Sequence, residues 1–245
     1  TLSGVAHLMP DGPNAELLLR ISGRKLKIGL RADTPEEFAA LPAYDVDYVL
    51  HGKGATAAEI AGTFNGYTRV VMGPGRTRGQ STSAFTQDAL LELMTALNPF
   101  AETDPYTNIK CLVAVTTVTD GMATGKPALV LQTDKMNAFA NATIDLKTEK
   151  LDIELTMVPQ KGLGIGLSDL VTPYTKIGGT LANPALVLDA EGALIEGGAA
   201  VATAGISILA KRFKERYLSA KDACGKALAD TAEEISELDA RYTFE

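Results

Sequence analysis

The residue types that most often perform catalysis or bind metals are scarce in this chain of 245 residues. The two histidines, His7 and His51, each lie in a strand-like segment without a cysteine or a second histidine nearby. A zinc site needs three or four ligands, and a catalytic base needs a partner within hydrogen-bond reach. We therefore interpret both histidines as surface or hydrogen-bonded strand residues, and we expect no metal, no cofactor and no enzymatic activity.

Glycine-rich segments and acidic residues could also form sites, but their contexts favour structural roles. Residues 73–79 (GPGRTRG) contain glycines and arginines, as a phosphate loop would, yet they do not lead into a helix N-terminus. We expect a hairpin turn with exposed arginines there. Residues 162–166 (GLGIG) lack the strand-to-helix context of a dinucleotide site. Asp145, Asp152 and Glu154 are predicted to lie on the solvated side of strands. The motifs of serine hydrolases, phosphate-binding loops and zinc proteases are absent.

The two cysteines allow one intramolecular pairing. Cys111 is predicted to lie in a strand, on the same side as Val113 and Val115, and Cys224 in a helix near the C-terminus. They are 113 positions apart (224 − 111). A disulfide closing a loop of this size would stabilise the chain by about 4.7 kcal/mol in a chain-entropy treatment. The alternative is two separate buried thiols, because free cysteine is often buried.

The composition excludes some classes of partner. The formal net charge is −7, tryptophan is absent and aromatic residues make up 6%. A nucleic-acid partner would favour a basic surface with aromatic residues that stack on bases, so we expect none. No run of apolar residues reaches the length of about 18–20 that a membrane-spanning helix needs.

Residues 109–188 are the most regular part of the chain. Strand-like segments at 109–118, 128–133, 138–146, 151–158 and 174–188 are separated by turns such as Asp120-Gly121 and residues 147–150. In residues 151–158, apolar and polar side chains alternate, which is typical of an antiparallel strand with one buried face. The segment therefore predicts an antiparallel ladder with one apolar and one polar face.

The apolar face of this ladder is the main candidate site. Burial of each of its side chains contributes roughly 1.5–3 kcal/mol, so the face must be covered by helix, by protein or by lipid. It could be an ordinary core against the C-terminal helices, or it could line a groove for acyl chains. Its predicted members are Leu129, Leu131, Ile144, Leu146, Leu151, Ile153, Leu155 and Met157.

The remaining segments complete the expected architecture. We predict a hairpin of residues 15–22 with 25–31 around Gly23-Arg24, and short helices at 34–41, 56–63 and 86–97. Longer helices are predicted at 190–217 and 220–239. Three regions result, and we expect them to form one continuous domain: a β-rich half (1–100), the ladder (101–188) and a helical cap (189–245). The predicted fold is β-rich α+β: a twisted, largely antiparallel strand meander that curls, with short helices and a helical C-terminal segment.

One helical segment suggests a membrane surface. Residues 197–210 contain no charge and are followed by a basic cluster: Lys211, Arg212, Lys214 and Arg216. The run is too short to span a bilayer. It could lie at a membrane interface with the cluster on anionic headgroups, or it could cap the sheet with the cluster in solvent.

Several of these segments, in this order, resemble the AsmA family. They are residues 50–66 (LHGKGATAAEIAGTFNG), 71–76 (VMGPGR), 109–115 followed by Asp120-Gly121, 142–146, and 178–184 (GGTLANP). A cysteine near the C-terminus, as Cys224 here, also fits the family's pattern. The resemblance covers residues 45–225, and no single motif carries it.

The resemblance implies a protein of the Gram-negative envelope. Such proteins have an inner-membrane helix and a periplasmic body, a curled β-sheet with an apolar groove. That body is thought to carry phospholipid between the inner and outer membranes or to support outer-membrane assembly. This chain resembles the C-terminal piece, so we expect a periplasmic module anchored through an upstream segment, with lipid and possible assembly proteins as partners. The alternative function is a scaffold whose exposed strand edges bind a partner protein by strand addition.

Overall fold

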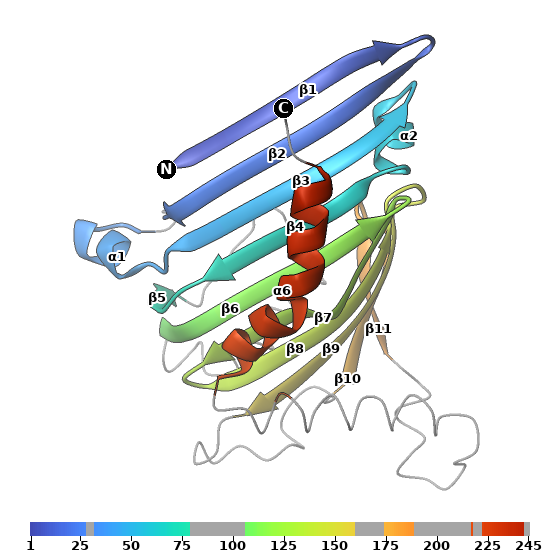
Figure 1. The fold of residues 1–245 in the computed structure, drawn as a ribbon. Helices are drawn as coiled ribbons and strands as arrows, with labels where there is room; N and C mark the ends of the chain where they lie inside the picture. The colour runs from blue at the N-terminus through green and yellow to red at the C-terminus, as the bar shows by residue number, and fades with distance from the viewer. Residues whose placement is uncertain (28–31, 79–105, 160–173, 189–216, 218–221, 243–245) are drawn as a thin grey trace, which may run out of the picture.

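The computed structural model describes residues 1–27, 32–78, 106–159, 174–188, 217 and 222–242. Its strands form one 11-stranded antiparallel sheet in the order β1-β2-β3-β4-β6-β7-β8-β9-β10-β11, and β5 also pairs with β6 (Figure 1). The strands are β1 (Leu2–Asp11), β2 (Asn14–Leu26), β3 (Tyr44–Gly54), β4 (Asn65–Met72), β5 (Gly75–Arg78), β6 (Tyr106–Thr119), β7 (Met122–Thr133), β8 (Met136–Asp145), β9 (Lys150–Pro159), β10 (Tyr174–Gly179) and β11 (Pro184–Leu188). The expected β-rich antiparallel meander is confirmed.

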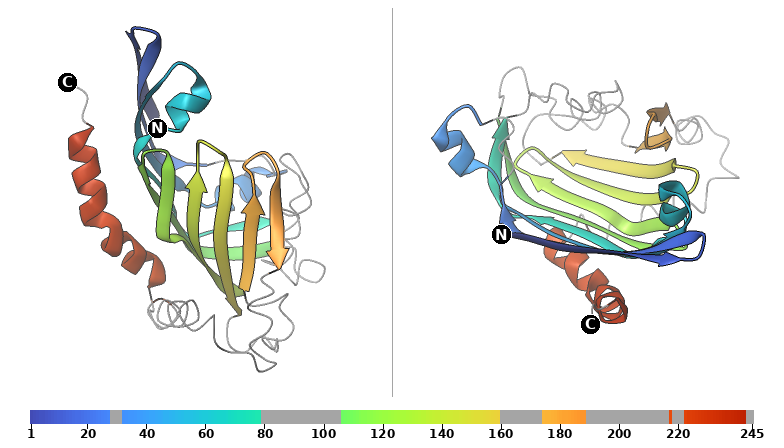
Figure 2. Two further views of the ribbon diagram at one scale, coloured as in Figure 1. Left: turned by 90° about the vertical axis from the view of Figure 1, so that its right-hand side faces the viewer. Right: turned by 90° about the horizontal axis from the view of Figure 1, so that it is seen from above.

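The sheet curls, and the C-terminal helix α6 (Ala223–Arg241) lies against its convex side (Figure 2). We call this side the outer face and the concave side the inner face. The two short helices, α1 (Pro35–Ala40) and α2 (Ala57–Ala61), lie at the ends of the strands. The predicted helix at 220–239 corresponds to α6.

The outer face forms the larger core. Its buried residues come from the central strands and from the facing side of α6, so the helix runs across the strands instead of along them. The members are Val49, Tyr67, Val113, Val115, Val130, Phe139, Tyr217, Ala223, Cys224, Ala227 and Ile235.

Local sequence signals explain the turns and caps. Asp120 and Gly121 both have positive φ (48° and 76°), as a tight two-residue hairpin requires. Thr34 and Thr56 cap the short helices, and their hydroxyls accept hydrogen bonds from Glu37 N (3.1 Å) and Glu59 N (3.2 Å). The predicted turn at Asp120-Gly121 is thereby confirmed.

The predicted hairpin around Gly23-Arg24 is wrong. β2 runs without a turn from Asn14 to Leu26 and pairs with β1 on one side and β3 on the other. Arg24 stays extended because its guanidinium donates to Val46 O (3.0 Å) and Asp47 Oδ1 (2.7 Å) on β3. The glycine marks a register shift between Gly23 and Leu26, with Lys25 at a φ of 52°.

The predicted hairpin at residues 73–79 is also wrong. β5 does not fold back on β4; both strands pair with β6, one after the other along its length. Gly73-Pro74 is therefore a break between two collinear strands. Gly75 packs so closely on Pro42 that an added Cβ would lie 2.3 Å from Pro42 N, which explains why glycine is needed there. Arg76 is exposed, as expected, and stacks over the Tyr106 ring.

Other predictions lie outside the described residues. These are the helix at 86–97, the helix at 190–217 except for Tyr217, the glycine-rich segment 162–166 and the whole basic cluster Lys211, Arg212, Lys214 and Arg216. The predicted region boundaries at 100/101 and 188/189 also involve residues outside the described ones. Because β4 pairs with β6, a single sheet contains strands from both sides of the 100/101 boundary. Among the helices that the structure describes, none has the length and hydropathy to cross a bilayer.

Candidate functional site: the inner face of the sheet

Strand register brings the predicted apolar residues together on the inner face. Leu131 lies opposite Ala138, which lies opposite Met157. In the next row Leu129, Ala140 and Leu155 are adjacent, and further along Ala142 lies between Gly125 and Ile153. Ile144 pairs with Leu151 at the end of β8. Leu146 falls in the turn after β8, and its backbone N–H donates to Gly121 O.

Burial divides these residues into two groups. Met136, Ala138, Ala140 and Leu155 form a small buried core, with Leu155 only 5% exposed. Leu129, Leu131 and Ile153 are only partly buried and pack against that core. Leu155 is therefore a core residue, whereas Ile153 and Leu129 have surface that a ligand could contact.

The inner face also extends over the N-terminal strands, beyond the residues predicted from the sequence. Leu19 lies opposite Leu50, Val46 opposite Val70, and Val70 opposite Ala114. Period-two alternation was available as a signal in β2, but Leu18 interrupts it by making the run Leu17-Leu18-Leu19 apolar on both sides. The additional half-buried members are Leu17, Leu19, Ile21, Val46, Tyr48, Leu50, Val70, Leu112 and Ala114.

The inner face contains no charged residue over its central strands. No residue of this face that is paired with a neighbouring strand is charged within the described segments 15–23, 44–52, 66–72, 112–118, 123–131, 136–144 and 151–155. Its polar members include Tyr48 and the adjacent pair Thr68 and Thr116, whose hydroxyls hydrogen-bond each other at 2.7 Å. A concave, uncharged surface with many half-buried apolar side chains can pack aliphatic chains without leaving buried charges unpaired.

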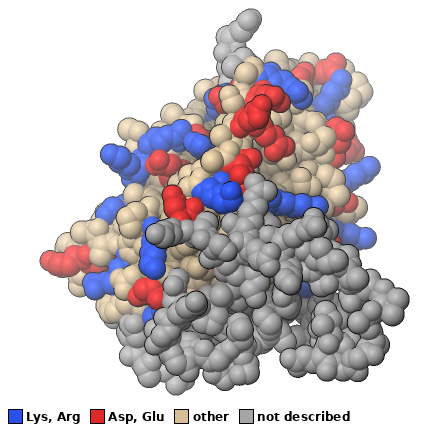
Figure 3. Space-filling model, turned by 60° about the horizontal axis from the view of Figure 1, so that its bottom comes forward, with Lys and Arg blue, Asp and Glu red and all other residues tan. Residues whose placement is uncertain are grey.

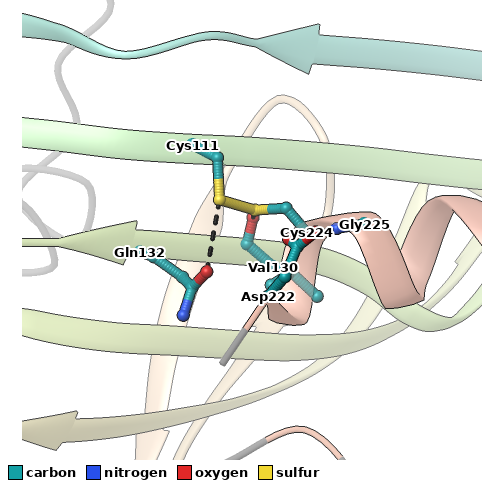
Figure 4. The surroundings of a disulfide bond; sticks show 6 residues. All are labelled: Cys111, Val130, Gln132, Asp222, Cys224 and Gly225. Atoms are coloured by element: carbon teal, nitrogen blue, oxygen red, sulfur yellow. Dashed lines mark hydrogen bonds between the residues drawn. A yellow bond between two sulfur atoms is a disulfide. The ribbon is translucent and has the colours of Figure 1, made fainter. Parts of the chain in front are cut away.

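The outer face is fixed to α6 by a disulfide. Cys111 on β6 and Cys224 in the first turn of α6 are bonded, with their Cα atoms 6.4 Å apart (Figure 4). The disulfide lies over β7, where Gln132 Oε1 is 3.4 Å from Cys111 Sγ and Val130 O is 4.0 Å from Cys224 Sγ. The Asp222 carboxylate accepts from Gly225 N at 2.7 Å and caps the helix. Of the two alternatives for the cysteines, the structure has the disulfide.

A polar network lies under the other half of α6. The Asp47 carboxylate is 8% exposed and accepts hydrogen bonds from Arg24, Ser22 and Arg69, each with a shortest distance of 2.7 Å. Burial would raise the pKa of Asp47, but these hydrogen bonds together hold it below its usual value.

A second carboxylate joins this network from the helix. Asp239 accepts from Arg20 and from the Tyr67 hydroxyl, both at 2.9 Å. Burial and the hydrogen bond to Asp239 raise the pKa of Tyr67 to about 12. The side chains surround an open pocket of about 350 Å³ between α6 and strands β2–β4. The network joins helix to sheet, and Figure 3 shows acidic and basic side chains interspersed on the visible described surface.

The remaining candidate residues occupy structural positions. His51 Nε2 lies 2.5 Å from Glu16 Oε1 on the outer face, and its ring stacks on Tyr242. The His51 and Glu16 side chains are 33% and 37% exposed. Asp145 accepts three hydrogen bonds from Lys147 and Thr148 in the turn after β8, and Asp152 pairs with Lys176 at 3.0 Å.

Comparison of the chain with models of protein families, with curated proteins and with solved structures finds no match.

Proposed function

We propose that the inner face binds the acyl chains of phospholipid, and that the chain is a non-enzymatic, periplasmic, AsmA-like module. In this proposal it serves phospholipid transport between the inner and outer membranes, or outer-membrane assembly, and is anchored to the inner membrane through an upstream segment. The observation that carries the proposal is the continuous uncharged inner face from β2 to β9, whose leucine, isoleucine and valine side chains are mostly half-buried outside the small core of Met136, Ala138, Ala140 and Leu155.

The energetics favour an aliphatic ligand. Covering half-exposed leucine, isoleucine and valine side chains stabilises a complex by about 25 cal/mol per Å² of apolar surface removed from water. Each methylene of an acyl chain contributes about 0.8 kcal/mol in the same way. A polar ligand would lack partners here, because the rows offer few hydroxyls and no charges.

Native mass spectrometry with lipid extraction tests this proposal. Protein purified gently from a Gram-negative periplasm should carry phospholipid in a stoichiometric amount. A ligand-free mass, with no phospholipid above the level that an unrelated periplasmic protein carries, would contradict it.

A second candidate function is a scaffold that binds a partner by strand addition. The observation that favours it is the N-terminal edge of the sheet, where every residue of β1 is exposed. Crosslinking in the periplasm from β1 distinguishes the two: a protein adduct supports the scaffold, and adducts with lipid alone count against it.

A further inference from the structure

The pocket under α6 brings three arginines of the sheet together. Arg20 and Arg24 on β2 and Arg69 on β4 all line the open pocket of about 350 Å³ on the outer face. The carboxylates among its described lining residues are Asp47 and Asp239. Three guanidiniums and two carboxylates leave one positive charge of this lining without a counterpart. A pocket of this volume is large enough for a small molecule.

Attachment of the helix does not account for two of these arginines. Arg20 donates to Asp239 on α6, but the hydrogen bonds of Arg24 and Arg69 all go to the sheet. Both donate to the carboxylate of Asp47, which is 8% exposed and lies on β3, between the strands that carry them. Asp47 therefore holds the two guanidiniums in fixed positions at the sheet wall of the pocket.

Each of these two guanidiniums has N–H groups left for a further acceptor. A guanidinium has five N–H donors in all. Arg69 donates to Asp47 through Nε and Nη2, and its Nη1 has no hydrogen-bond partner among the described residues. Arg24 donates through Nη1 and Nη2, and its Nε has no partner in the same part of the chain. The side chains of Arg24 and Arg69 are 48% and 33% exposed, so a ligand can approach them from solvent.

The opposite wall of the pocket offers apolar surface. Leu228, Ala232 and Ile235 of α6 line it. A ligand with an anionic group and a small organic body would therefore find N–H donors on the sheet and aliphatic side chains on the helix. The donors come from β2 and β4, on the two sides of β3. A tetrahedral phosphate presents oxygens in several directions, whereas the two oxygens of a carboxylate share one plane, so phosphate fits this arrangement better.

We propose that this pocket binds the phosphate group of a small phosphate ester, either free in solution or as the headgroup of a phospholipid. Arg24 and Arg69 donate to the phosphate oxygens, and Asp47 is the positioning residue that orients both guanidiniums. The pocket lies on the outer face, on the other side of the sheet from the proposed acyl-chain site. The two proposals therefore stand or fall independently.

Isothermal titration calorimetry of the delipidated full chain with glycerol 3-phosphate tests this proposal, and we expect saturable one-to-one binding. Arg69→Lys keeps the charge and can still pair with Asp47, but it lacks the second edge of the guanidinium. Its affinity should fall about tenfold, as expected for the loss of one charge-assisted hydrogen bond. Arg76→Lys is the matched control and should bind as the parent does, because Arg76 is exposed but stacks over Tyr106 outside the pocket. No saturable binding, or equal affinities of Arg69→Lys and the parent, would overturn the proposal.

Asp239→Asn tests the proposal through a gain of affinity, which a purely structural network does not predict. The amide oxygen can still accept from Arg20 and Tyr67, while one negative charge is removed from the pocket. Loss of a unit charge about 4 Å from the phosphate should tighten binding of glycerol 3-phosphate roughly fivefold. Unchanged or weaker binding by this variant, at an unfolding midpoint close to that of the parent, would overturn the proposal.

Competition with vesicles identifies the source of the phosphate. Once glycerol 3-phosphate is shown to bind, the complex is mixed with vesicles of phosphatidylglycerol. Displacement of the bound glycerol 3-phosphate assigns the site to a phospholipid headgroup, and retention assigns it to a phosphate ester free in solution.

Discussion

Phe139 and Ala140 are neighbours on β8, yet they belong to different cores. Phe139 packs on the outer face with Tyr217 and the residues under α6, and Ala140 packs on the inner face with Leu155. The helix that covers Phe139 therefore cannot cover Ala140. This separation leaves the inner face of the strands without α6, and it is the basis of the proposed lipid groove.

Removal of the disulfide should destabilise the fold. The bond closes a loop of 113 residues and ties α6 to β6. We expect the double variant Cys111→Ser/Cys224→Ser to lose about 2–5 kcal/mol of the free energy of unfolding. Urea denaturation measures the loss, and reduced parent protein should unfold at the same midpoint as the variant. Equal stability of the oxidised parent and the double variant would contradict this expectation.

Acid should weaken the hydrogen bonds by which Asp47 on β3 holds β2 and β4. Its pKa is lowered in the folded chain, so its contribution is present above the unfolded value of 3.8 and is lost as pH falls below that value. Asp47→Asn should cost about 1–3 kcal/mol at neutral pH. When the free energy of unfolding is measured by denaturation at several pH values, it should fall less steeply toward acid pH in the variant than in the parent. An equal loss of stability at acid pH in parent and variant would mean that other carboxylates govern acid unfolding.

Tyr67 should ionise above the ordinary range of a phenol. Its raised pKa of about 12 means that its stabilising effect is complete below the unfolded value of 10.0 and is lost as pH rises through about 12. Tyr67→Phe should remove the component near pH 12 from a tyrosinate absorbance titration and cost about 1 kcal/mol. A titration curve identical to that of the parent would disprove the assignment.

Burial predicts different roles for two neighbouring inner-face residues. Leu155→Ala should cost about 2–5 kcal/mol, because it empties a buried site in the small core. Ile153→Ala should cost less, because Ile153 is only partly buried. Thermal or urea unfolding of the two variants measures the difference. Equal losses would mean that Ile153 is as much a core residue as Leu155.

The sequence predicted the ladder well because its local signals agree with one another. Alternation in β9 and the Asp120-Gly121 turn each specify local geometry, and the structure has both of them. Gly23-Arg24 misled the prediction, since a glycine in a strand can mark a register shift as well as a turn.

The sequence alone does not show which face of the sheet the C-terminal helix covers. The central strands are apolar on both sides, with Val113 and Val130 outward and Leu112 and Leu129 inward, so alternation alone does not say which side meets α6. The disulfide decides this, because Cys111 shares the outer face with Val113. Likewise, the contribution of β2–β4 to the inner face follows from register, which depends on contacts far apart in the sequence.

The most direct test of the account is phospholipid co-purification with Ile153→Asp and its matched control Thr156→Asp. Both residues are half-buried on β9, but Ile153 is on the inner face and Thr156 is on the outer face. With both variants folded, as judged by their unfolding midpoints, we predict that Ile153→Asp loses bound phospholipid and Thr156→Asp keeps the parent's amount. Equal lipid content in the parent and in both folded variants would contradict the assignment of the inner face as a lipid site.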